Sequence, residues 1–183
     1  MSTAGKCPCC NTAYEWEGPP AFHAALCPQC HMHLVRDAPP LQVMLLHADA
    51  KAPRHATAGS AGMDLFAYPA DEQVEILPGQ RVCIPTGIAV AVPIGFELQI
   101  RPRSGLAAHF GVTVINPPGT IDADYRGEVV VILINHGAAA YTVARGDRIA
   151  QAVLAPVTTC AIDIVPSLSP AASRTGGLGS TGR

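Results

Sequence analysis

The stretch Asn116-Pro117-Pro118-Gly119-Thr120-Ile121-Asp122-Ala123-Asp124-Tyr125-Arg126-Gly127-Glu128 concentrates carboxylates, a phenol, a guanidinium and an amide between two apolar segments. The prolines and Gly119 predict a bend, and Gly127 is expected to adopt the positive φ that a tight turn needs. Asp122 is ionised at neutral pH and can take a proton from a nearby water molecule. A second interpretation stays open on these residues alone, in which both aspartates only stabilise a surface turn.

The segments on either side of this stretch predict β-strands. Residues 129–134 are continuously apolar and β-branched, which predicts a strand covered on both faces and, in an antiparallel protein, a subunit interface. Residues 96–101 alternate apolar and polar side chains, which predicts a strand with one buried face.

Further strands are expected at residues 41–46, 74–77, 80–84 and 148–154, with turns at Pro78-Gly79 and at Arg145-Gly146-Asp147. No long amphipathic helical pattern appears. Many short strands separated by turn residues are typical of an all-β protein, a sandwich or jelly roll.

Composition restricts the function further. The chain has 183 residues and a formal net charge of -2, so nothing global favours nucleic acid or a membrane surface as partner. The first six residues lack the apolar centre of a signal peptide, and no apolar run is long enough to span a bilayer. We therefore expect a cytoplasmic protein with reduced thiols.

Four cysteines near the N-terminus predict a structural zinc site. Cys7, Cys10, Cys27 and Cys30 have the spacing Cys-x2-Cys-x16-Cys-x2-Cys, which suits a closed tetrahedral site. A disulfide pair or iron are the alternatives, and Cys9 is a less well spaced substitute ligand. Residues 1–36 resemble a zinc ribbon whose charges sum to zero, so protein contact or stabilisation is a better expectation than nucleic-acid binding.

The predicted organisation is a module at 1–36, a linker at 37–40, a β domain at 41–172 and a C-terminal arm at 173–183.

Five stretches in order resemble the five motifs of the trimeric dUTPases. They are residues 61–65, 101–107, 116–128, 145–151 and 174–182. Each is weak alone, but the ordered set is specific, and it covers residues 41–183. The zinc-ribbon-like extension lies outside the usual family pattern.

The resemblance implies a β jelly roll, a homotrimer with active sites between subunits, and hydrolysis of dUTP to dUMP and pyrophosphate with Mg²⁺. This reaction removes dUTP and supplies dUMP for dTMP synthesis. Asp122 matches the family's water-activating carboxylate, and Tyr125 matches the ring that packs under the deoxyribose. Asn116, with Gly119 and Ile121 of the same hairpin, matches the positions that read the uracil edge.

The resemblance also implies the phosphate contacts. Ser104, Gly105, Arg103 and Gln151 match phosphate-binding positions, and Asp64 matches the residue that anchors the site and its magnesium-bound water. The C-terminal arm would close over bound nucleotide through Arg174, Leu178, Gly179, Ser180 and Thr181. The family usually has Phe where this chain has Leu178, and without a ring stacked on uracil we expect weaker substrate capture.

Simpler roles remain for several other residues. Arg101 and Arg148 can be framework ion-pair residues, Asp147 a turn residue, and His109 a packed side chain. Cys83 and Cys160 are expected to be inert core thiols.

Two other functions compete with dUTP hydrolysis. One is a dCTP deaminase or a bifunctional relative, and the other is a regulatory adaptor that senses dUTP. The residues Asn116 and Tyr125 favour the hydrolase over the deaminase.

Overall fold

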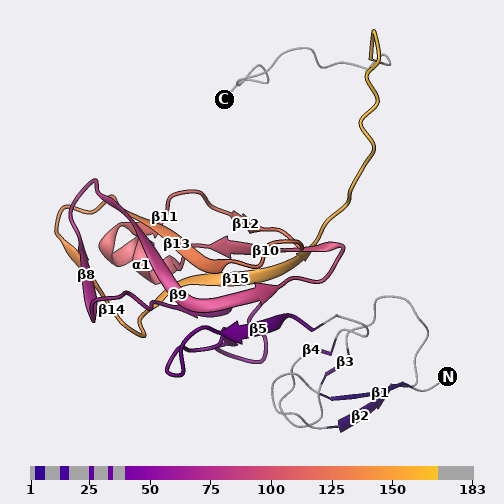
Figure 1. Cartoon of the computed structure of the whole chain (residues 1–183), viewed down its shortest axis with the longest axis horizontal. Helices are drawn as coiled ribbons and strands as arrows, with labels where there is room; N and C mark the ends of the chain where they lie inside the picture. The colour runs from indigo at the N-terminus through magenta and orange to yellow at the C-terminus, as the bar shows by residue number, and fades with distance from the viewer. Residues whose placement is uncertain (1–2, 7–12, 17–24, 27–32, 35–39, 169–183) are drawn as a thin grey trace.

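A computed structural model describes residues 3–6, 13–16, 25–26, 33–34 and 40–168 (Figure 1). The elements are β1 (Thr3–Lys6), β2 (Ala13–Trp16), β3 (Ala25–Leu26), β4 (His33–Leu34), β5 (Gln42–Leu45), β6 (Arg54–His55), β7 (Met63–Phe66), β8 (Gln73–Ile76), β9 (Arg81–Ala91), β10 (Phe96–Arg101), α1 (Ser104–Phe110), β11 (Val112–Val114), β12 (Gly119–Ile121), β13 (Glu128–Asn135), β14 (Tyr141–Ala144) and β15 (Arg148–Pro156).

Two antiparallel sheets enclose the core of the domain. One has the strand order β12-β10-β15-β7-β6 and the other β11-β13-β9-β5, while β14 and β8 form a separate pair. The core draws side chains from both sheets, among them Leu98 and Ile149 from the first and Ile84 and Val131 from the second. The expectation of an all-β domain is confirmed in the main, because antiparallel strands build both sheets and only one short helix is present among the described residues.

The apolar strand β13 differs from its prediction. Its burial alternates, so Val129, Val131 and Leu133 are buried while Val130 on the other face is 40% exposed. Within one chain the strand therefore has one buried face and not two. The second face is left partly uncovered, with Ile132 and Ile134 half-buried on it.

Two other expectations need correction. The thiols of Cys83 and Cys160 are both exposed, so they are not core thiols. Cys83 lies on the outward face of β9, opposite Ile132, and Cys160 follows the last strand. In addition, a short helix of seven residues, α1, lies between the strands at residues where no helix was predicted.

The predicted zinc ligands Cys7, Cys10, Cys27 and Cys30 lie outside the described residues. The strands around them are described: β1 pairs antiparallel with β2, and β3 pairs antiparallel with β4. No helix in the described part of the chain is long and apolar enough to cross a membrane.

Candidate active site

The strand β12 lies at the edge of its sheet. It pairs with β10 on one side, with Gly119 opposite Ile100 and Ile121 opposite Leu98. Among the described residues, no strand pairs with its other side. Backbone N–H and C=O groups on a free strand edge can pair with another planar hydrogen-bonding partner. The side chain of Asn116, which precedes this strand, is exposed.

Asp122 and Tyr125 lie in the turn that follows β12. The Tyr125 N–H donates to the Asp122 carbonyl oxygen at 3.2 Å, and both side chains are exposed, so the carboxylate is open to water. The Tyr125 hydroxyl donates to the Glu128 carbonyl oxygen at 2.8 Å.

The predicted reason for Gly127 is wrong. Gly127 is not among the glycines with positive φ. A Cβ at this position would instead lie 2.5 Å from the Tyr125 hydroxyl oxygen and 2.8 Å from its Cζ. Gly127 therefore leaves the room that the phenol ring occupies, and the hydrogen bond to the Glu128 carbonyl holds the ring there.

A second group of predicted residues surrounds Asp64. This carboxylate is buried, 8% exposed, and both of its oxygens accept from guanidinium groups at 3.2 Å, Oδ1 from Arg103 Nε and Oδ2 from Arg148 Nη1. Arg103 also donates to the Arg148 carbonyl oxygen at 3.0 Å. Arg148 is thus a framework ion-pair residue, whereas Arg101 donates to Gln99 and forms no ion pair within the described residues.

Gln151 links β15 to the loop before α1. Its Nε2 donates to the Pro102 carbonyl oxygen at 2.9 Å, two residues before Ser104, the exposed first residue of α1. A Cβ on Gly62 would overlap Gln151 Oε1 and lie 3.1 Å from its Cδ. Because Gly62 has no positive φ, the requirement for glycine comes from this contact alone.

Gly62→Ala should therefore destabilise the protein by about 1–3 kcal/mol, the usual cost of forcing extra volume into a packed position. Gly59→Ala is the matched control, since a Cβ at Gly59 meets nothing within 4 Å. Urea unfolding of both variants measures the difference. Equal stabilities of the two variants would contradict the contact between Gly62 and Gln151.

The two groups of predicted residues are separate within one chain. The strand order puts β10 and β15 between β12 and β7, so β12, which precedes Asp122, and β7, which carries Asp64, are about 14 Å apart at the usual strand spacing. No hydrogen bond or ion pair within the described residues joins the β12 turn to the Asp64 group. The arm residues Arg174, Leu178, Gly179, Ser180 and Thr181 lie outside the described residues.

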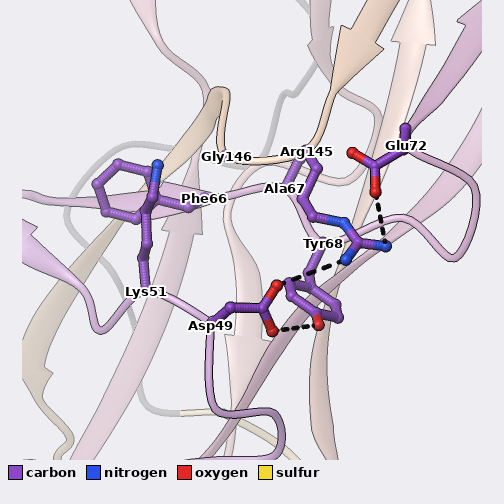
Figure 2. Close-up of a pocket in the computed structure, with 8 residues that line it drawn as sticks. All are labelled: Asp49, Lys51, Phe66, Ala67, Tyr68, Glu72, Arg145 and Gly146. Atoms are coloured by element: carbon purple, nitrogen blue, oxygen red, sulfur yellow. Dashed lines mark hydrogen bonds and ion pairs between the residues drawn. The ribbon is translucent and has the colours of Figure 1, made fainter.

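A cluster of side chains surrounds Arg145, and its contacts were not predictable from the sequence. Its guanidinium lies 4.4 Å from the Tyr68 ring centroid and pairs with Asp49 at 3.5 Å and Glu72 at 3.9 Å (Figure 2). Tyr68 donates to Asp49 at 2.6 Å. The sequence indicated a turn at Arg145-Gly146-Asp147 and the start of the fourth motif, but not these contacts, because the partners of Arg145 lie far away in the sequence. Asp147 is a turn residue as expected, since it accepts from the Ala144 N–H.

The same cluster shifts two pKa values. The hydrogen bond from Tyr68 lowers the pKa of Asp49 and raises that of Tyr68. Stability from Asp49 is therefore fully present above its unfolded pKa of about 4 and is lost as the pH falls through its lower folded pKa.

Sequence comparison identifies the family. The sequence model of the dUTPase family matches residues 48–182. The chain belongs to the dUTPase family. Deoxyuridine 5'-triphosphate nucleotidohydrolase from Syntrophotalea carbinolica is 51% identical over 142 residues, which cover 78% of this chain and 96% of the relative. The enzyme of the same name from Maricaulis maris is 58% identical over 131 residues, 71% of this chain and 86% of the relative.

Solved dUTPases share the fold. A dUTPase variant of Staphylococcus bacteriophage 80alpha with dUpNHpp gives a TM-score of 0.70 at 26% identity, covering 78% of this chain and 98% of that one. A phage phi11 dUTPase variant, described with a structural Mg(II) ion, gives 0.64 at 26% identity, covering 70% and 98%. By its family and its identity to these relatives, this dUTPase is a dUTP diphosphatase, which hydrolyses dUTP.

Proposed function

We propose that this dUTPase hydrolyses dUTP to dUMP and pyrophosphate with Asp122 as the general base. The supporting observation is the exposed Asp122 carboxylate in the turn after a free strand edge. The carboxylate takes a proton from water, and the water oxygen forms a bond to the α-phosphorus. The bond from the α-phosphorus to the α,β-bridging oxygen breaks, and its electron pair leaves with pyrophosphate.

The uracil is proposed to bind along the free edge of β12. Backbone donors and acceptors at Gly119 and Ile121 would pair with the base edge, and the exposed Asn116 amide would add a side-chain partner. Such a slot rejects cytosine because its donors and acceptors are mispaired, and thymine because of its methyl group. Tyr125, held by Gly127 and by the Glu128 carbonyl, would pack under the deoxyribose and leave no room for a 2′-hydroxyl.

The phosphates are proposed to bind at the Asp64 group. Ser104 offers an exposed hydroxyl beside the Gly105 backbone. Arg103 and Gln151 would also contact phosphate, after a small shift away from Asp64 and from the Pro102 carbonyl oxygen. Positioning and charge neutralisation are the main requirements of phosphoryl transfer. The arm residues Arg174, Leu178, Gly179, Ser180 and Thr181 would close over the bound nucleotide.

Magnesium is proposed to bind the triphosphate and not a protein cage. Both Asp64 oxygens accept from arginines, and the described residues contain no group of three or more His, Cys, Asp or Glu suited to an ion. This donor set fits Mg²⁺, which prefers phosphate oxygens and water, with Asp64 reaching it through water. When bound, the ion neutralises the charge on the phosphate oxygens.

A homotrimer with active sites between subunits is proposed. The separation of Asp122 from the Asp64 group suits a site completed by a second subunit. Two apolar surfaces are also available for contact: the outer face of β13 with Val130, and residues 157–168, where Ile162 and Ile164 are 90% and 93% exposed.

We further propose that residues 1–36 bind zinc. The six residues between β1 and β2 contain Cys7 and Cys10, and the six between β3 and β4 contain Cys27 and Cys30. Two antiparallel strand pairs, each with a Cys-x2-Cys sequence between its two strands, suit a closed four-thiolate site. Contact with another protein is the role we propose for this module.

Zinc analysis of the purified protein should find about one ion per chain. Cys27→Ser should lose the zinc, while Cys160→Ser, which removes a thiol outside the module, should keep it. Atomic absorption on both variants measures this. Zinc that persists after deletion of residues 1–36 would contradict the assignment.

Substrate comparison tests the proposed function. With Mg²⁺ present, dUTP should be hydrolysed with a kcat/KM at least about 100-fold above that for dCTP, UTP or dTTP, because mispaired polar groups and added bulk are rejected. Pyrophosphate release and base identity are followed for each nucleotide. Ammonia release from dCTP would instead indicate a deaminase, and dUTP binding without pyrophosphate release a regulatory protein.

A further inference from the structure

Phe66 is buried outside the main core. It is only 5% exposed, yet it is absent from the core cluster that contains its neighbour Leu65. Successive side chains of a strand point to opposite faces, so Phe66 and Asp64 share the outer face of β7. The Phe66 ring is therefore covered by side chains on the outer face of the sheet, which is the face that carries the Asp64 group.

Two cations cover this ring. Lys51 Nζ and the guanidinium carbon of Arg54 each lie 5.4 Å from the Phe66 ring centroid. Both distances are within the range of a cation–π contact, which fixes the position of a side chain without using its N–H donors. Lys51 lies beside Phe66, and both residues line an open pocket of about 220 Å³ (Figure 2).

Neither cation has a carboxylate partner within the described residues. The nearby carboxylates are taken by other arginines: Asp64 by Arg103 and Arg148, and Asp49 and Glu72 by Arg145. The donors of Lys51 and Arg54 are therefore available to an incoming anion. An ammonium offers three such donors and a guanidinium five.

Strand pairing brings Arg54, and Phe66 with Lys51 against its ring, next to the Asp64 group. In the β6–β7 pair Arg54 lies opposite Asp64, and in the β7–β15 pair Phe66 lies opposite Arg148. In a chain with a net charge of -2, two unneutralised cations here form a local positive field. Such a field attracts a polyphosphate and raises its rate of association.

We propose that Lys51 and Arg54, held by Phe66, form a capture site for the terminal phosphates of dUTP. This rests on the proposed function, and it adds two residues outside the five motifs. Lys51 and Arg54 bind the β- and γ-phosphates and take no part in the reaction at the α-phosphorus, for which Asp122 is the proposed base.

The test uses variants that keep the cover over Phe66 but lose the charge. Lys51→Met/Arg54→Met should lower kcat/KM for dUTP about 10-fold at low ionic strength, with kcat unchanged within about twofold. The dependence of kcat/KM on salt should become shallower, because two exposed charges no longer attract the substrate. Lys51→Arg/Arg54→Lys should restore wild-type behaviour. Arg36→Met, which removes one charge before the domain, should have no effect.

Inhibition by the two reaction products shows which part of the nucleotide Lys51 and Arg54 contact. Inhibition by inorganic pyrophosphate should weaken about 10-fold in the double variant, while inhibition by dUMP should not change. An unchanged kcat/KM and salt dependence, with only a lower melting temperature, would overturn the proposal, since the pair would merely cover Phe66. Equal loss of pyrophosphate and dUMP inhibition would overturn it as well.

Failure of this inference is distinguishable from failure of the proposed function. Absence of dUTP turnover by the wild-type protein would count against the proposed function. Calorimetric titration of wild type and double variant with pyrophosphate tests the capture site independently of turnover. Identical pyrophosphate affinities would overturn the role of Lys51 and Arg54 even if the wild type is fully active.

Discussion

Asp122→Asn should lower kcat for dUTP by about 1,000-fold, within the range that a positioned general base contributes. The amide keeps the shape of the carboxylate but cannot take the proton from water at neutral pH. KM should change little, because Asp122 is proposed to act on water and not on the nucleotide. Steady-state release of pyrophosphate measures both constants.

Asp124→Asn is the matched control for this substitution. Asp124 lies in the same turn, is equally exposed, and has no assigned role in the reaction. Its replacement should leave kcat within about twofold, the effect expected of a surface charge change. If Asp122→Asn retains wild-type turnover, or if Asp124→Asn loses as much, the assigned base is wrong.

Asp64→Asn should reduce the free energy of unfolding by about 3 kcal/mol, the lower end of the cost of removing one partner from a buried ion pair. The lower end applies because Arg148 is about half exposed and its charge is partly screened by water. Without the carboxylate, the guanidinium groups of Arg103 and Arg148 are left close together and uncompensated. The same change should lower kcat/KM, because Arg103 and the loop carrying Ser104 lose their anchor.

Asp147→Asn is the control for stability. Asp147 is exposed and accepts one backbone N–H, which an amide oxygen can also accept. We expect a change within about 0.5 kcal/mol, as for most surface substitutions. Urea unfolding is compared at one protein concentration, because oligomers gain apparent stability with concentration. A loss for Asp64→Asn no larger than for Asp147→Asn would contradict the anchoring role.

The strands were predictable because their side-chain pattern is local. Alternation in residues 96–101 predicted β10, in which Leu98 and Ile100 are buried. The predicted turn at Pro78-Gly79 is present, and Gly79 has a positive φ there. The exposure of the second face of β13 could not be predicted from its apolar residues. The burial of that face depends on which other segments pack against it, and the sequence of the strand does not determine this. The exposure of Cys83 depends in the same way on its place on an outer sheet face.

Long-range contacts account for the features of the site that were missed. The sequence placed Asp122 and Tyr125 in a turn, but the reason for Gly127 is a steric contact with Tyr125 and not a backbone angle. The contacts of Arg145 and Phe66 could not be predicted, although Arg145 lies in a predicted turn and motif, because the partners are distant in sequence, up to the 96 residues between Asp49 and Arg145. The resemblance to a family located motif residues, and residues outside the motifs emerged only from the fold.

The most direct measurement is a crystal structure of the Asp122→Asn protein with dUTP and Mg²⁺, in which slow turnover preserves the substrate. Uracil is expected against the free edge of β12, with a water molecule about 3 Å from the substituted side chain and in line with the α-phosphorus. A nucleotide bound away from β12, or no water between residue 122 and the α-phosphorus, would contradict it.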